Sequence, residues 1–196
     1  MTPEEQSIAD AMAADDWAEA ERLGGILDAQ PRPVPDLLAS ALWYASIGLQ
    51  VFPLQPGRKV PFTGSNGCKD ATTDAAMIRR WWAAAPNANI GIATGHLVDV
   101  IDIDGAPGIR SWLDLEAPPE AIGNVRTPRP GGSHHYLRAT GRGNRAGIFP
   151  GIDYRGLGGY VLAPPSWLDE QPGQPYSGHY TWSKPLAISP TIEQET

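Results

Sequence analysis

Two aspartates, Asp102 and Asp104, stand near the end of an apolar, β-branched segment at residues 98–105. Side chains alternate between the two faces of a strand, so both carboxylates project to one face, while Ile101 and Ile103 project to the other. Neighbouring carboxylates repel each other unless a cation compensates their charge, and a divalent metal ion with oxygen ligands is such a cation. The alternative is a strand that ends at a turn, where water solvates both acids. The segment alone leaves both interpretations open.

Two later segments carry residue types that suit the same chemistry. Residues 129–136 (RPGGSHHY) place two glycines, which let the backbone approach a ligand closely, just before His134 and His135. Asp153 adds a third carboxylate between apolar residues, and Arg155, two positions later, is expected on the same face. The chain therefore presents paired aspartates, histidines and a further aspartate, in that order.

Charge is distributed unevenly along the chain, although the net charge is -7. Residues 1–36 hold nine acids against two arginines, whereas residues 125–156 hold six arginines against Asp153 alone. Guanidinium groups match the geometry of phosphate, so an arginine-rich stretch beside paired carboxylates suits phosphates bridged through a metal ion. The alternative is an ordinary solvated basic face. We favour phosphate recognition, because this stretch contains almost no acids to pair with its arginines.

Composition predicts one compact domain with appendages. The chain has 196 residues, 41% of them hydrophobic, which is enough for a core. Its single cysteine, Cys68, excludes an internal disulfide and a cysteine-cluster zinc site. No apolar run approaches the length of a membrane span, and the acidic N-terminus lacks the basic start of a signal peptide, so we expect a cytoplasmic protein.

Local patterns place helices and strands around these groups. Residues 3–23 are expected to form an accessory acidic helix, followed by a Pro-rich linker up to residue 35. Further helices are expected from Asp36 to Gly48, from Thr73 or Asp74 to Pro86 and over residues 109–115. Trp81 and Trp82 belong to an apolar stripe and are expected in the core. The expected strands cover residues 49–54, 89–94, 98–104, 133–138, 151–154 and 159–163, with the last three in an antiparallel sheet.

Taken together, these segments resemble a known family. The runs VIDIDG, GGSHHYL and GIDYRGLGGYVLAPPS are similar, in this order, to motifs I, II and III of the bifunctional DNA primase/polymerase N-terminal domain, the Prim-Pol branch of the archaeo-eukaryotic primase superfamily. The preceding runs ALWYASIGLQVFPLQPGRKVP and GCKDATTDAAMIRRWWAAAPNANIGIATG are also similar to that family. The resemblance covers residues 37–182. Such domains are common in phages, plasmids and mobile elements.

The resemblance implies an α/β (α+β) fold of the archaeo-eukaryotic primase type. In that fold an N-terminal α/β module joins an RRM-like, mostly antiparallel sheet, and the active site lies in the groove between them. The expected division of the chain is an accessory acidic helix and linker at 1–35, a Prim-Pol catalytic domain at 36–183 and a tail at 184–196.

The resemblance also implies roles for individual residues. Asp102, Asp104 and Asp153 would be the catalytic metal ligands, and His134 would contact the nucleoside triphosphate. The superfamily's general Ser-x-His motif would instead select Ser133 and His135, but the Gly-Gly-x-His-x-Tyr form selects His134, which we favour. Only one of these histidines is expected to reach the site, because adjacent strand residues face opposite sides. Arg155 is expected to contact phosphate, with Arg129 and Lys59 as further candidates and Ser133 in the other register.

The implied activity is that of a DNA primase and DNA-directed DNA polymerase of phage, plasmid or mobile-element type. It would transfer nucleotides with two divalent ions, Mg²⁺ or Mn²⁺, on a single-stranded DNA template, with a primer and nucleoside triphosphates as partners. The family often joins this domain to a helicase, so a helicase domain or subunit is an expected partner. A membrane is not expected as a partner. Two alternatives are a non-catalytic, single-stranded-DNA-binding replication-initiation module and a metal-dependent phosphohydrolase or nuclease.

Overall fold

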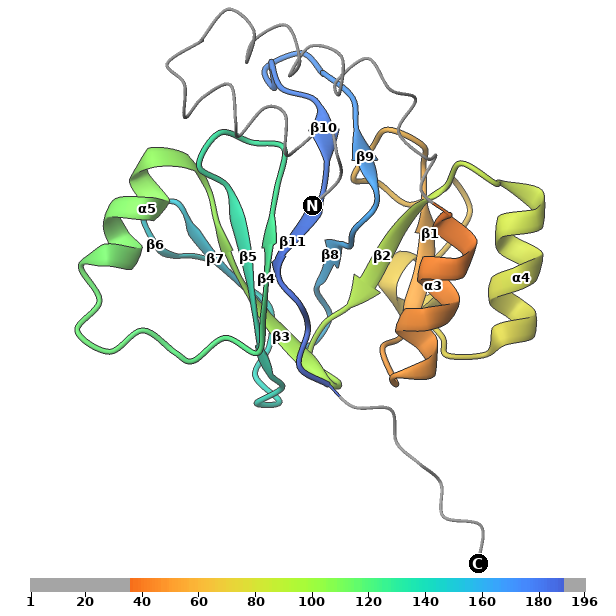
Figure 1. The fold of residues 1–196 in the computed structure, drawn as a ribbon, viewed down its shortest axis with the longest axis horizontal. Coiled ribbons are helices and arrows are strands. Elements are labelled where there is room, and N and C mark those ends of the chain that lie inside the picture. The colour runs from red at the N-terminus through yellow and green to blue at the C-terminus, as the bar shows by residue number, and fades with distance from the viewer. Residues whose placement is uncertain (1–35, 189–196) are drawn as a thin grey trace, which may run out of the picture. The chain divides into compact units, whose positions relative to one another are not determined.

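The computed structural model describes residues 36–188, and within this range the chain forms an α+β fold with antiparallel sheets (Figure 1). The helix and linker expected within residues 1–35 lie outside the described residues. The described range falls in a compact unit that begins at Asp36. None of its helices combines the length and apolar character that a membrane span requires.

One sheet has three strands, in the order β1-β2-β8. These strands are β1 (Val51–Leu54), β2 (Asn89–Ala93) and β8 (Tyr160–Leu162). Helices α3 (Leu37–Ser46) and α4 (Ala75–Ala84) contact this sheet, as does the short 3₁₀ helix η1 (Gly67–Asp70). Both α3 and α4 begin where the sequence predicts, because the carboxylates of Asp36 and Asp74 accept hydrogen bonds from first-turn amides.

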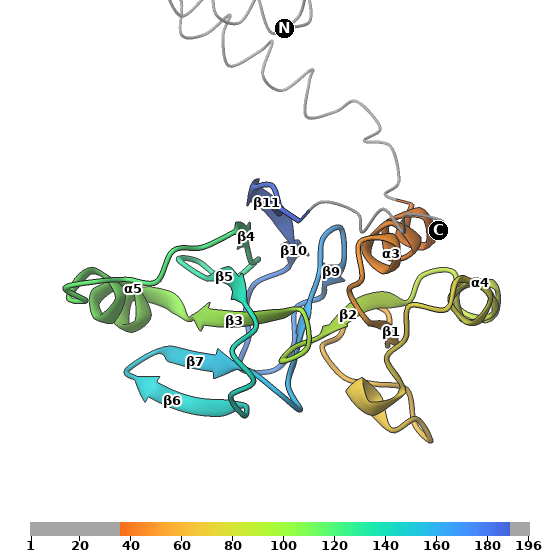
Figure 2. The same ribbon diagram turned by 90° about the horizontal axis from the view of Figure 1, so that it is seen from below.

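The other large sheet has six strands, in the order β11-β4-β5-β3-β7-β6. Its strands are β3 (Val98–Ile103), β4 (Gly123–Arg126), β5 (Ser133–Arg138), β6 (Arg145–Phe149), β7 (Ile152–Arg155) and β11 (Thr181–Lys184). Helix α5 (Gly105–Leu113) follows β3 directly and contacts both β3 and β7 (Figure 2). Strand β3 is therefore interior, with β5 on one side and β7 on the other.

The alternation of side chains in β3 divides the core in two. Val98 and Val100 belong to the main cluster, which also contains Ile90 and Ile92 of the three-stranded sheet. Ile101 and Ile103 face the opposite side and pack in a smaller cluster, against Trp112 of α5 among others. The face of β3 that carries Asp102 is thus the face that looks toward the three-stranded sheet.

Several elements differ from the sequence-based expectation. Strand β8, expected in one sheet with residues 133–138 and 151–154, pairs instead with β2 in the three-stranded sheet. Helix α5 begins at Gly105, where a φ of +62° turns the chain immediately after β3. Leu186, placed by the sequence in the tail, is buried against the main core. Five strands were not expected: β4, β6, β9 (Trp167–Leu168), β10 (Gly178–His179) and β11.

Candidate active site

Three predicted site residues form a row across the middle of the six-stranded sheet. Asp102 of β3 lies directly opposite His134 of β5 on one side and Asp153 of β7 on the other. Directly opposed residues share one face of a sheet, so all three side chains point the same way. The Nε2 atom of His134 lies 3.5 Å from Oδ1 of Asp102. Side chains that follow Asp102 by 32 and 51 positions in the sequence are thereby brought into one row with it.

Arg155 joins the two carboxylates of this row. Its Nη2 atom donates to Oδ2 of Asp153 at 2.7 Å and to Oδ2 of Asp102 at 3.2 Å. The remaining oxygen of Asp153 accepts from the amide of Gly147 at 2.7 Å. The three side chains are between 15% and 28% exposed, so water screens this cluster only in part. Arg155 thus supplies the cation that adjacent carboxylates require.

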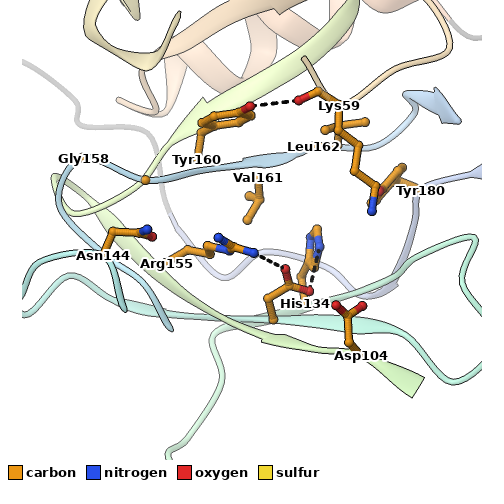
Figure 3. Close-up of a pocket in the computed structure, with 12 residues that line it drawn as sticks. Lys59, Asp104, His134, Asn144, Arg155, Gly158, Tyr160, Val161, Leu162 and Tyr180 are labelled. Carbon is orange, nitrogen blue, oxygen red and sulfur yellow. Dashed lines mark hydrogen bonds and ion pairs between the residues drawn. The ribbon is translucent and has the colours of Figure 1, made fainter. Parts of the chain in front are cut away.

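A cavity of about 300 Å³ opens in front of this row (Figure 3). Five predicted residues line it: Lys59, Asp102, Asp104, His134 and Arg155. The strand β8 residues Tyr160, Val161 and Leu162 form part of its wall, so both large sheets contribute. Asp153 does not line the cavity itself. It contacts Arg155, which does.

The two histidines lie on opposite faces of β5. His134 is buried beside Asp102, and its ring centroid lies 5.5 Å from that of Tyr180. His135 packs 4.6 Å from the ring of Trp112, on the α5 side, where it also contacts the Ser133 hydroxyl at 3.2 Å. The structure therefore brings His134, and not His135 or Ser133, to the cavity. Burial lowers the pKa of both histidines below the usual 6.5.

Asp104 lines the cavity but is paired at its other side with an arginine. Nη1 of Arg129 lies 2.8 Å from Oδ1 of Asp104, and this hydrogen bond raises the pKa of the arginine. Asp104 is also the N-cap residue of α5, yet its carboxylate makes no capping hydrogen bond there. Arg129 and Ser133 do not line the cavity with Asp102; they line a second one, beyond the turn between β4 and β5.

The arrangement of the carboxylates bears on whether metal ions would fit. Within residues 36–188, no three Asp, Glu, His or Cys side chains converge in a way that could hold an ion. Arg155 holds Asp102 and Asp153, and Arg129 holds Asp104. The donor chemistry still fits a hard divalent ion, because carboxylate oxygens line a cavity together with cations that match phosphate. These carboxylate oxygens would hold such an ion, and the two arginines contact the same oxygens.

The cavity residues that were not assigned to the site from the sequence include Asn144, Tyr160 and Tyr180. The Tyr160 hydroxyl donates to the carbonyl of Lys59 at 2.9 Å and so fixes the loop that carries the lysine. Tyr180 is 2% exposed, and burial raises the pKa of its hydroxyl. No local pattern in the sequence pointed to Asn144 or Tyr180.

Asp99 is the other aspartate of β3 and lies on the face opposite Asp102. It is fully buried, and its Oδ2 accepts from the amide and hydroxyl of Thr140 at 2.7 and 2.9 Å and from the hydroxyl of Tyr154. Burial, and then the bond to Asp99, raise the pKa of Tyr154. These bonds tie the segment after β5 to the sheet, so Asp99 has a structural role.

Comparisons with known proteins agree with the geometry. A search of curated proteins gives no match. A family model described as the N-terminal domain of bifunctional DNA primase/polymerases, Prim-Pol, matches residues 41–192. That range contains every residue of the row and of the cavity wall. The chain belongs to the family of bifunctional DNA primase/polymerase N-terminal domains.

Proposed function

We propose that this domain is a template-directed nucleotidyltransferase, a DNA primase and DNA polymerase of phage, plasmid or mobile-element type. The observation that carries the proposal is the row of His134, Asp102 and Asp153, which faces a cavity that also contains Lys59 and Arg155. Carboxylates and phosphate-matching cations around one cavity suit a nucleoside triphosphate. Proposed partners are a single-stranded DNA template, a primer and a helicase domain or subunit, in the cytoplasm of a bacterium or a phage-infected cell.

The three aspartates would hold two divalent ions, Mg²⁺ or Mn²⁺. When bound, such ions lower the pKa of an attacking 3′-hydroxyl and offset the charge of the triphosphate and of the departing pyrophosphate. Asp102 stands between His134 and Arg155, and Asp104 and Asp153 lie next to it along the chain and across the sheet, so these three carboxylates would hold the ions. Asp102 is also oriented by contacts with His134 and Arg155 on its two oxygens.

The cations of the cavity would position the triphosphate. Lys59 enters from the loop after β1 and Arg155 from the opposite sheet, so a triphosphate between them would be held from two sides. Burial lowers the pKa of His134 and so favours the neutral ring, which offers a phosphate oxygen one N–H donor. These residues contribute orientation and charge rather than proton transfer.

A second candidate function follows from the arginine pairing. All three carboxylates carry an arginine partner, an arrangement that also suits a non-catalytic module that only binds single-stranded DNA. A phosphohydrolase or nuclease would use the same acids to activate water. The two alternatives differ from the polymerase in their products, so one assay separates all three.

The test is extension of a 5′-labelled primer on a single-stranded template with deoxynucleotides and Mg²⁺ or Mn²⁺. We expect extension by the unchanged chain and a loss of at least 100-fold, on the order expected for removal of a metal ligand, in Asp102→Asn. Asp114→Asn, an exposed aspartate at the end of α5, is the matched control and should extend normally. A labelled primer that becomes shorter would indicate a nuclease. Template binding without extension would favour the binding module.

A further inference from the structure

A second cavity, of about 430 Å³, lies at the turn between β4 and β5. It is formed by the turn itself, by Arg126 at the end of β4, by Ser133 at the start of β5, and by Ile109 of α5 and Ser183 of β11. Its size falls in the range of ligand-binding pockets. None of the roles proposed for the first cavity uses it.

The described residues that line this cavity include two arginines, Arg126 and Arg129, and no acid. Arg126 is exposed. Arg129 lines this cavity and also pairs with Asp104 at 2.8 Å, and Asp104 lines the first cavity. The Arg129–Asp104 ion pair therefore joins the linings of the two cavities. The two arginines favour an anionic ligand in the second cavity, beside this ion pair.

The walls of the cavity are preformed and partly apolar. Gly132 packs against Thr127 and Arg129 so closely that a Cβ there would collide with the Thr127 hydroxyl, and Gly131 has a φ of +72°. The turn is held by hydrogen bonds from Thr127 to Gly132 and from Gly132 to Arg129, at 3.2 and 2.8 Å. Pro128, Pro130 and Ile109 add apolar surface. An inorganic anion needs no such surface, whereas the sugar of a nucleotide unit does.

We propose that this cavity binds a phosphodiester of the DNA strand, one or more nucleotide units away from the joining site, with Arg126 as its principal contact. The inference rests on the proposed function. The two cavities would then bind two kinds of phosphate. Lys59 and Arg155 receive the triphosphate of the incoming nucleotide, and Arg126 receives a backbone phosphate of the DNA strand. Arg129, between the two cavities, contacts the strand next to Asp104.

The test measures single-stranded DNA binding by fluorescence anisotropy, at several salt concentrations, for the unchanged chain, Arg126→Gln and Arg110→Gln. Arg110 is exposed, follows Ile109 in α5 and does not line the cavity. The variant Arg110→Gln therefore removes the same charge a short distance away from the cavity. We expect Arg126→Gln to weaken DNA binding about threefold to tenfold and to lower the slope of log K against log salt by about 0.7, the value for one phosphate contact to a single strand. Arg110→Gln should change neither. Binding of a free deoxynucleoside triphosphate should be the same in all three.

Each contrary outcome has a distinct meaning. Equal DNA affinity in the unchanged chain and Arg126→Gln would overturn this inference and leave the proposed function standing. Equal losses in Arg126→Gln and Arg110→Gln would reduce the effect to general charge, which also overturns it. A parallel loss of triphosphate binding in Arg126→Gln would assign the cavity to the incoming nucleotide instead. A chain that binds the triphosphate but no DNA would overturn both the inference and the polymerase function.

Discussion

Asp102 and Asp153 are direct cross-strand partners, and their carboxylates share one guanidinium nitrogen of Arg155. The attraction between Arg155 and the two acids offsets the repulsion between the acids themselves. A divalent ion bound by the same oxygens would take over that role. Arg155 and metal ions are therefore expected to compete for Asp102 and Asp153, and displacement would free the guanidinium for phosphate.

The first prediction concerns Arg155→Gln. Without the guanidinium, two neighbouring carboxylates lose their partner, so we expect the free energy of unfolding to fall by about 1–3 kcal/mol in the absence of divalent ions. Mn²⁺ should raise the melting temperature of this variant more than that of the unchanged chain, because the competing cation is gone. Differential scanning fluorimetry with and without Mn²⁺ measures both effects, with Arg110→Gln as the control. An equal Mn²⁺ response in all three chains would contradict the competition.

The second prediction concerns the buried Asp99. The variant Asp99→Asn keeps the shape of the side chain but removes the charge of the carboxylate that accepts hydrogen bonds from Thr140 and Tyr154. We therefore expect the free energy of unfolding to fall by about 1–3 kcal/mol. Tyr154→Phe removes only one of these donors and should cost less, about 0.5–1.5 kcal/mol. Urea unfolding of the two variants gives both values. A larger effect for Tyr154→Phe would show that the carboxylate is not the centre of the network.

The third prediction is a dependence of stability on pH. Burial lowers the pKa of His134 and His135, so both stay neutral in the folded chain at a pH where the unfolded chain, with a histidine pKa near 6.5, takes up protons. The unfolded state then binds more protons, and the free energy of unfolding decreases as pH falls below 6.5, by up to about 1.4 kcal/mol per pH unit for each histidine. Urea unfolding at several pH values between about 7.5 and about 5.5, a range that spans the titration of an ordinary histidine, checks this. His135→Gln should reduce the dependence; an unfolding free energy that is constant over this range would exclude it.

The fourth prediction uses two glycines near Asn144. A Cβ on Gly159 would collide with the Asn144 side chain and approach Thr94 Oγ1 at 2.9 Å, whereas a Cβ on Gly143 would meet nothing within 4 Å. Gly159→Ala should therefore move Asn144 out of the cavity wall and weaken triphosphate binding several-fold, at a cost of about 1–3 kcal/mol in stability. Gly143→Ala should leave triphosphate binding unchanged. Isothermal titration of the two variants decides the matter, and equal affinities would show that Asn144 is not needed.

Local patterns predicted the elements that bury one clear face. Helices α3 and α4 have capping aspartates and apolar stripes, and Trp82 is in the core as expected, at 2% exposure. Strand β5 has the predicted bounds, and β2 and β3 end within one residue of them. The alternation in β3 was sufficient to predict that Asp102 and Asp104 share a face. The roles assigned to the site residues and the metal ions stay predictions.

The features that the sequence did not predict depend on partners far away in the chain. Strands β4 and β6 are short and each contains a glycine, and β6 is mostly exposed at the edge of the sheet, so pairing rather than local preference defines them. Tyr180 reaches the cavity only because the chain returns to the sheet edge in β11. Asp99 is buried because its donors come from Thr140 and Tyr154, 41 and 55 positions later. The residues around Asp99 in the sequence do not indicate Thr140 or Tyr154 as its partners.

The passage of the chain from β7 in one sheet to β8 in the other has a further consequence. Arg155 ends β7 and Tyr160 begins β8, so the two walls of the first cavity are linked by only a few residues. Neither sheet alone encloses a binding space, and the cavity exists only while both are packed together. Loss of ligand binding and loss of the main core should therefore coincide on denaturation, as a single transition, with no intermediate that retains half of the site.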